Sequence, residues 1–144
     1  MNDRRSWIPL IVLGMFLASP SCGKKGPPFL PQKAFDIGVE DLQGEWTEGY
    51  ALLKGNVRGH EEPKRLVKGS RVYYAQYPLD KPPCEGCPIE YQGYRDLGPE
   101  VMTETGFSCK VPARMRGQVY FFKVHLVGKD GVLGPPSKTV QVTV

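Results

Sequence analysis

The chain has 144 residues, of which 40% are hydrophobic and 24% are charged. These values are typical of one globular domain with a tail, and they exclude a wholly disordered or fibrous protein. The formal net charge of +4 is small, and the basic residues are spread along the sequence, so we expect no nucleic-acid partner. The 17 glycines and 14 prolines are typical of a chain with many turns, as in an all-β domain.

Residues 1–21 have the layout of an export signal. Arg4 and Arg5 precede an apolar run over residues 8–18, and small or turn-forming residues then lead directly to Cys22. The run is too short to span a bilayer, which requires about 20 apolar residues. A buried core helix is the alternative interpretation, but such a helix would carry polar residues at helical spacing, and this run carries none. We therefore expect this segment to be a signal peptide.

The end of this segment resembles the signal of bacterial lipoproteins, in which small residues directly precede a cysteine. In that family the cysteine becomes the first residue of the mature protein, and its thiol and its amine carry acyl chains. The resemblance implies that Cys22 is lipidated and holds the protein to membrane lipid, since each buried CH₂ contributes about 0.8 kcal/mol. The chain departs from the family at Ser19, where leucine is usual, and at Pro20. An ordinary secretory signal that is cut nearby is the alternative.

Residues 22–33 are rich in Gly, Pro and Lys and are expected to form a tether. The stretch Cys-Gly-Lys-Lys-Gly-Pro-Pro over residues 22–28 is similar to the mature start of small envelope lipoproteins, one family of which is tied to lipopolysaccharide-transport assembly. Lys24 and Lys25 would lie beside phospholipid headgroups. Gly23 stands where enteric-type sorting rules place Asp for inner-membrane retention. The resemblance therefore implies a lipid anchor in the cell envelope, at the outer membrane and facing the periplasm.

The pattern of residues 34–144 predicts short strands separated by turn residues. None of its segments shows a sustained helical period. Seven strands in roughly 110 residues predict a single immunoglobulin-like β-sandwich. The expected strands lie at residues 34–42, 50–57, 71–77, 91–97, 101–111, 119–127 and 138–144.

The last third of the chain resembles the final two strands of a fibronectin type III domain, most clearly over residues 117–144, and residues 71–74 resemble that family's third strand. The resemblance implies that Tyr120 is the tyrosine-corner residue, with its hydroxyl bonded back to nearby backbone. The Lys-Asp-Gly sequence at residues 129–131 predicts a turn. The family's second strand usually carries a Trp, whereas here Trp46 lies just before that strand. Strand alternation places these side chains toward the core: Tyr120, Phe122, Val124 and Leu126, and from the last strand Val140, Val142 and Val144.

Three cysteines remain once Cys22 is set aside, and they are the only candidate chemistry of the domain. Cys84 and Cys87 form a Cys-x-x-Cys motif that is flanked by prolines, in the connection between the third and fourth strands. Because an export signal leads to an oxidising compartment, we expect a structural disulfide between Cys84 and Cys87, with Cys109 as a buried free thiol. A variant pairs Cys109 with one member of the motif.

The same motif has two functional interpretations. A thioredoxin-type redox site places Cys-x-x-Cys at a helix N-terminus, where the helix dipole lowers the pKa of the first thiol, but the surrounding residues predict no helix. A zinc site needs four ligands, for which Cys84, Cys87 and Cys109 would be joined by His60 or His125, yet the chain has no second Cys-x-x-Cys. We expect no metal and no cofactor. An envelope thiol or metal-handling protein is the alternative function.

The sequence carries no catalytic motif, since it lacks a Gly-x-Ser-x-Gly elbow, a His-Glu-x-x-His helix and a phosphate-binding glycine loop. We therefore expect a non-enzymatic envelope lipoprotein whose sandwich contacts a protein or polysaccharide partner. Several tyrosines gather in one region, where they either cover the sheet, which is the favoured interpretation, or form an interaction surface. They are Tyr73, Tyr74, Tyr77, Tyr91 and Tyr94.

Overall fold

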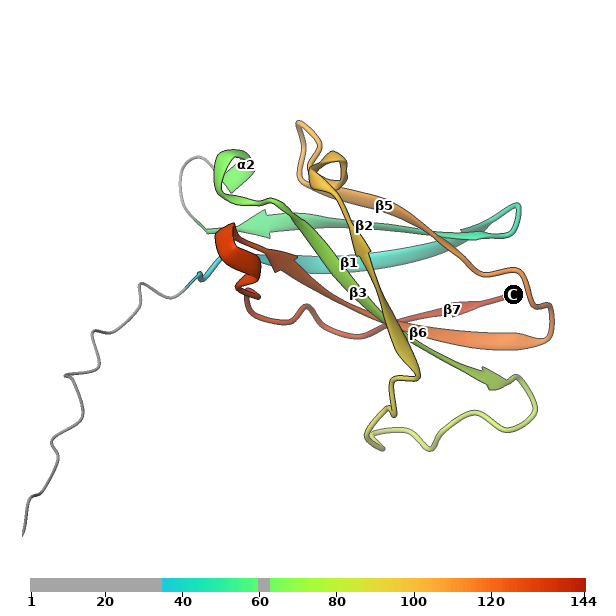
Figure 1. The fold of residues 1–144 in the computed structure, drawn as a ribbon. Helices are drawn as coiled ribbons and strands as arrows, with labels where there is room; N and C mark the ends of the chain where they lie inside the picture. The colour runs from blue at the N-terminus through green and yellow to red at the C-terminus, as the bar shows by residue number, and fades with distance from the viewer. Residues whose placement is uncertain (1–34, 60–62) are drawn as a thin grey trace, which may run out of the picture. The chain divides into compact units, whose positions relative to one another are not determined.

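The computed structural model describes residues 35–59 and 63–144, which belong to one compact unit (Figure 1). The predicted signal peptide, the lipidation site Cys22, the tether over residues 22–33 and His60 lie outside the described residues. In the part of the chain that is described, no helix has the length and apolar character needed to cross a membrane.

The described residues form seven strands in two antiparallel sheets, one with the order β1-β2-β5 and the other with the order β4-β3-β6-β7 (Figure 1). The predicted all-β sandwich of seven strands is confirmed. The strands are β1 (Gly38–Thr47), β2 (Tyr50–Arg58), β3 (Gly69–Pro78), β4 (Gly93–Leu97), β5 (Phe107–Pro112), β6 (Gln118–Val127) and β7 (Val140–Thr143).

Strand β6 shows why the alternation of its residues predicts the sheet. Phe122, Val124 and Leu126 are fully buried and Tyr120 is nearly so, while the residues between them are partly exposed. Successive side chains of a strand point to opposite faces, so β6 turns one apolar row into the space between the sheets. The row packs with residues of the opposing sheet, among which Leu53 is also fully buried.

The first strand lies later in the chain than predicted, at Gly38–Thr47 instead of residues 34–42. It continues beyond an irregularity between Glu40 and Gln43, where Asp41 has a positive φ of 50°, and it then pairs with β2 as far as Tyr50. A bulge of this kind inserts unpaired residues and shifts the alternation of the strand. The second half of β1 therefore does not continue the alternation of inward and outward residues that its first half shows.

The fifth predicted run, residues 101–111, is divided in the structure. A short 3-10 helix, η1 (Pro99–Val101), precedes β5. Between them, Met102 and Phe107 form an isolated β-bridge, and the turn that connects these two residues contains Gly106, whose φ is 143°. Two further short elements occur: the single-turn α2 (Pro63–Leu66), which was not predicted, and the 3-10 turn η2 (Lys129–Gly131) at the predicted turn.

The two sheets lie close together where β1 meets β7. At Gly44 an added Cβ would lie 2.6 Å from Val142 Cγ2 and 3.2 Å from Leu53 Cδ2. Core packing in proteins leaves little room for an extra methyl group. The glycine therefore allows β1 to lie against β7 and to close that side of the core.

Candidate functional site

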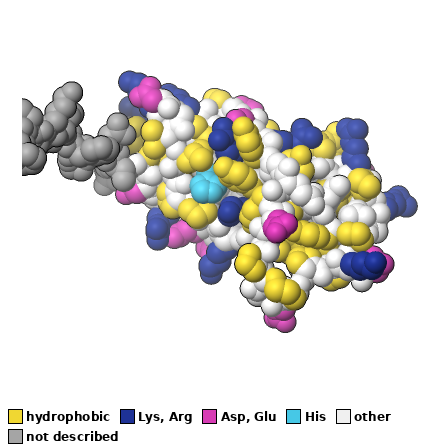
Figure 2. All heavy atoms as spheres, turned by 60° about the horizontal axis from the view of Figure 1, so that its bottom comes forward, with side chains coloured by type: hydrophobic (Ala, Val, Ile, Leu, Met, Phe, Trp, Pro, Cys, Tyr) yellow, Lys and Arg dark blue, Asp and Glu magenta, His cyan; other side chains and the backbone are white. Residues whose placement is uncertain are grey.

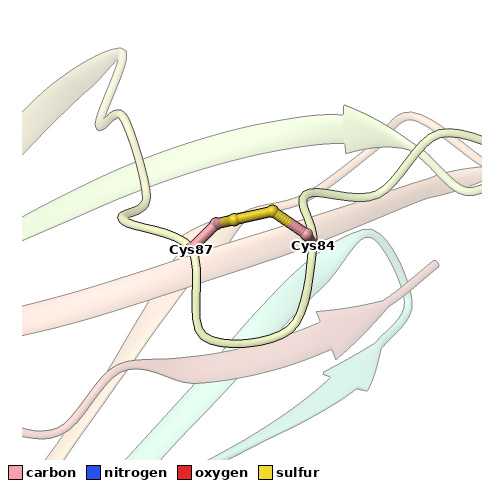
Figure 3. The surroundings of a disulfide bond; sticks show 2 residues. All are labelled: Cys84 and Cys87. Atoms are coloured by element: carbon pink, nitrogen blue, oxygen red, sulfur yellow. A yellow bond between two sulfur atoms is a disulfide. The ribbon is translucent and has the colours of Figure 1, made fainter.

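The predicted disulfide is present in the connection between β3 and β4. Cys84 and Cys87 are bonded, with their Cα atoms 5.3 Å apart, and the amide of Cys87 donates to the carbonyl of Cys84 at 3.0 Å (Figure 3). Gly86 takes a φ of 79°, which glycine adopts without a steric penalty. We call residues 82–89 the disulfide loop. Both cysteines are exposed, so the bond is accessible from solvent.

The connection that carries the disulfide loop is fixed to the sheet by Gln92. Its side-chain amide nitrogen donates to the carbonyl of Gln76 at 2.9 Å, and its carbonyl oxygen accepts from the amide of Gln76 at 3.3 Å. The side chain thus satisfies the N–H and C=O groups of Gln76 as a neighbouring strand would, just before β4 begins. The hydroxyl of Tyr77 also donates to the carbonyl of Glu90 at 3.3 Å. These bonds hold the loop against the outward face of the four-stranded sheet.

Aromatic side chains gather on this outward face, which we call the tyrosine face (Tyr73, Tyr91, Tyr94 and Phe121). The ring of Tyr73 lies 6.0 Å from that of Tyr91 and 5.7 Å from that of Tyr94. Phe121 meets Tyr77 edge to face at 5.9 Å. Figure 2 shows hydrophobic side chains with Lys and Arg among them on the side of the molecule that is turned forward. Exposed aromatic side chains are enriched at binding surfaces.

Two cations lie over these rings, and they differ in their charge partners. The guanidinium of Arg71 lies 4.2 Å from the centroid of Tyr94 and makes a bidentate pair with Asp96, at 2.7 and 2.8 Å. This hydrogen-bonded pairing lowers the pKa of Asp96 and raises that of Arg71. The ammonium of Lys123 lies 4.4 Å from the centroid of Tyr91 and 5.6 Å from that of Tyr73. No carboxylate of the described residues lies within 4.0 Å of it.

A groove of about 820 Å³ separates the disulfide loop from the sheet. Its floor consists of Phe121 and Lys123 from β6, Gln141 from β7, and Tyr91 and Thr139, whose hydroxyls are hydrogen-bonded to each other at 2.8 Å. The roof is the disulfide loop, including its three prolines. The groove combines aromatic rings, an amide, hydroxyls, the cation of Lys123 and the carboxylate of Glu85, so it can make apolar, hydrogen-bonding and ionic contacts.

Cys109 lies apart from the motif, on β5 of the other sheet. It is a free thiol with an exposed fraction of 8%, and burial raises its pKa to about 12. The structure does not bring it to Cys84 and Cys87, and the described residues contain no group of three or more His, Cys, Asp or Glu side chains placed to hold a metal ion. The proposed four-ligand set of the metal interpretation is therefore not assembled.

Three other residues that the sequence singled out, Tyr120, Trp46 and His125, each lie within hydrogen-bonding distance of the backbone. The hydroxyl of Tyr120 accepts from the amide of Met115 at 3.3 Å, and Trp46 lies on β1, where its indole N–H donates to the carbonyl of Ala113 at 3.0 Å. The Nδ1 of His125 is 2.8 Å from the carbonyl oxygen of Gly134. His125 lies on the outward row of β6, and its ring is 5.5 Å from that of Tyr73.

The sequence singled out the tyrosines and cysteines of this region, Tyr91 of the groove floor among them, but not the other floor residues, which are Phe121, Lys123, Thr139 and Gln141. The signal was present in β6, where the outward positions carry Phe121 and Lys123 between the buried residues. A bulky aromatic residue on an outward row indicates that something covers it. Gln141 gave no such signal, because only the register of β7 against β6 brings it beside Phe121.

Comparison with known proteins bears on the fold. No protein-family model and no curated protein match the chain. A solved structure described as "Myokine structure" is 14% identical with a TM-score of 0.51, covering 76% of this chain and 97% of its own. An Fn3-like protein from Clostridium thermocellum is 14% identical with a TM-score of 0.44, covering 74% and 90%. A family 76 glycoside hydrolase from a bovine Bacteroides thetaiotaomicron strain is 17% identical with a TM-score of 0.48, covering 76% of this chain and 20% of that one. At these identities the likeness concerns the sandwich alone.

Proposed function

We propose that the protein is a non-enzymatic lipoprotein of the bacterial cell envelope, anchored through acylated Cys22, that presents its sandwich as a binding or structural module. The observation that carries the proposal is the position of Cys22, between a segment with the layout of an export signal and a tether rich in Gly, Pro and Lys. The sandwich that follows supports it, because such modules serve as spacers and binding units. The fold by itself does not name the partner.

The intact mass of the protein made in a Gram-negative host tests the anchor. The protein is extracted from membranes without reductant, and free thiols are alkylated in denaturant, because Cys109 is buried in the folded protein. We expect the loss of residues 1–21, a mass gain of two or more acyl chains on Cys22, and one alkylated thiol, Cys109. The Cys22→Ser variant should lose the acyl mass and leave the membrane fraction. A wild-type product without acyl mass in the soluble fraction would contradict the anchor.

One observation favours a second function, that of an envelope thiol protein. The Cys84–Cys87 bond is exposed to solvent, as a disulfide that exchanges with other proteins must be. The bond does not lie at the N-terminus of a helix, the place where a cysteine pKa is usually lowered. The double variant Cys84→Ser/Cys87→Ser separates the two functions. If the variant restores the phenotype of a strain that lacks this protein as well as the wild-type protein does, the binding module is favoured. If it folds but fails to restore that phenotype, thiol chemistry is favoured.

A further inference from the structure

The groove under the disulfide loop has a floor and a roof with different chemistry. The floor offers the ring of Phe121, the amide of Gln141 and the paired hydroxyls of Tyr91 and Thr139. The roof consists of three prolines and the disulfide, together with Glu85, Gly86 and Ile89. Proline has no N–H to donate to a neighbouring strand, so the roof is poorly suited to an extended peptide that binds by backbone hydrogen bonds. The recognition groups of the groove are therefore its side chains.

Among the described residues that line the groove, Lys123 of the floor is the cation and Glu85 of the disulfide loop is the carboxylate. The ammonium of Lys123 is positioned over the rings of Tyr91 and Tyr73, at 4.4 and 5.6 Å from their centroids, and no described carboxylate is paired with it. Arg71, which lies over the ring of Tyr94, is already neutralised by Asp96. A cation that is held in place and lacks a counter-ion complements a ligand carboxylate, with which it makes a charge-assisted hydrogen bond.

A sugar ring matches this combination of groups. A pyranose has an apolar face of C–H groups that packs on an aromatic ring, and a rim of hydroxyls that pairs with amides and hydroxyls. We propose that the groove binds a carboxylate-bearing polysaccharide strand, with a sugar face on Phe121, hydroxyls at Gln141 and Thr139, and the carboxylate at Lys123. This inference deepens the proposed function by naming the class of partner.

The test is calorimetric titration of the full-length gene product, purified from whichever fraction contains it. The acidic probes are polygalacturonate oligomers and peptide-free glycan strands that carry lactyl carboxylates. Their neutral counterparts are carboxyl-reduced oligomers and chitin oligosaccharides. We expect at least one acidic glycan to bind roughly tenfold more tightly than its neutral counterpart, and its affinity to fall as salt is added, because the Lys123 contact is partly exposed.

The variants locate the site. Lys123→Met keeps the apolar stem and should weaken acidic-glycan binding roughly tenfold, while Gln141→Ala, at an exposed position, should weaken it roughly threefold. Lys110→Met is the matched control, because Lys110 is an exposed strand lysine on the opposite sheet. It should bind as the wild type does. Thermal melting of each variant checks that the fold is retained.

Three outcomes would overturn the proposal: no binding to either acidic glycan, equal affinity for the acidic and neutral members of both pairs, or binding that Lys123→Met leaves unchanged. Oligoglutamate that binds as tightly as the glycans and is equally sensitive to Lys123→Met would assign the groove to an acidic peptide instead. The acyl mass on Cys22 is measured separately. Glycan binding by a protein without acyl chains would retain the groove and reject the anchor, and the converse result would reject the groove alone.

Discussion

The hydroxyl of Tyr120 joins β6 to the segment that precedes it. It accepts from the amide of Met115 at 3.3 Å, and Tyr120 has an exposed fraction of only 4%. Tyr120→Phe keeps the packed ring and removes the acceptor, which leaves a partly buried N–H without its partner. We expect the free energy of unfolding to fall by about 1 kcal/mol, as measured by urea denaturation.

Tyr50→Phe is the control for this variant, because the side chain of Tyr50 is 38% exposed and removal of its hydroxyl should change stability by less than about 0.5 kcal/mol. Equal stability of Tyr120→Phe and the wild-type protein would show that this hydrogen bond adds nothing to the fold.

Cys109 makes stability depend on pH in the alkaline range. Burial raises the pKa of its thiol from 9.0 to about 12 in the folded protein, while the unfolded chain loses this proton near its ordinary pKa. Between these values the folded state holds more protons than the unfolded state, so stability is full below about pH 9 and falls as the pH rises toward 12.

We expect the loss of unfolding free energy between pH 8 and pH 10 to be roughly 1 kcal/mol larger in the wild type than in Cys109→Ala. Urea denaturation at the two pH values measures it, and comparison with the variant cancels the other groups that titrate there. Identical pH dependence in the two proteins would mean that the thiolate is tolerated in the folded state.

At the scale of elements, the disulfide acts on one loop. It closes a segment of four residues, from Cys84 to Cys87, and a loop this short loses little chain entropy, so the bond should contribute at most about 2 kcal/mol. Reduction should lower the unfolding free energy by no more than this amount and leave the far-UV circular dichroism unchanged. The Cys84→Ser/Cys87→Ser variant should match the reduced protein. A reduced chain that unfolds outright would show that the disulfide loop supports the whole sandwich.

How much of the fold the sequence could predict differs from strand to strand. Strands β2, β3 and β6 were found to within two residues because their apolar residues alternate or cluster between clear turns. Strand β1 was placed too early, because its irregularity near Asp41 breaks the alternation. Local sequence patterns predict which face of a strand is buried. They do not reveal a bulge, because a bulge depends on how the strand pairs with its neighbour.

The candidate site was less predictable than the fold. The Cys84–Cys87 pair could be proposed because both partners lie in one short motif. The groove could not be predicted, because Lys123 and Gln141 come together only through the pairing of β6 with β7. The disulfide loop is held near them by the hydrogen bonds between Gln92 and Gln76, which no sequence motif predicts.

In the whole molecule the two sheets depend on each other. Gly44 of β1 lets Val142 of β7 approach across the core. The apolar row of β6 packs into the same core cluster as residues of β1, β2 and β5. Since neither sheet buries its inner face without the other, the described residues should unfold as one cooperative unit.

The processed protein offers a direct test of this cooperativity. Of the two tryptophans, Trp7 lies in the expected signal peptide, which leaves Trp46 as the reporter. Its fluorescence and the far-UV circular dichroism should give the same midpoint in urea. Gly44→Val, which forces extra volume between the sheets, should shift both midpoints together and cost about 1–3 kcal/mol. A fluorescence transition at lower urea than the dichroism transition would show instead that β1 separates first and that the four-stranded sheet, with its groove, persists alone.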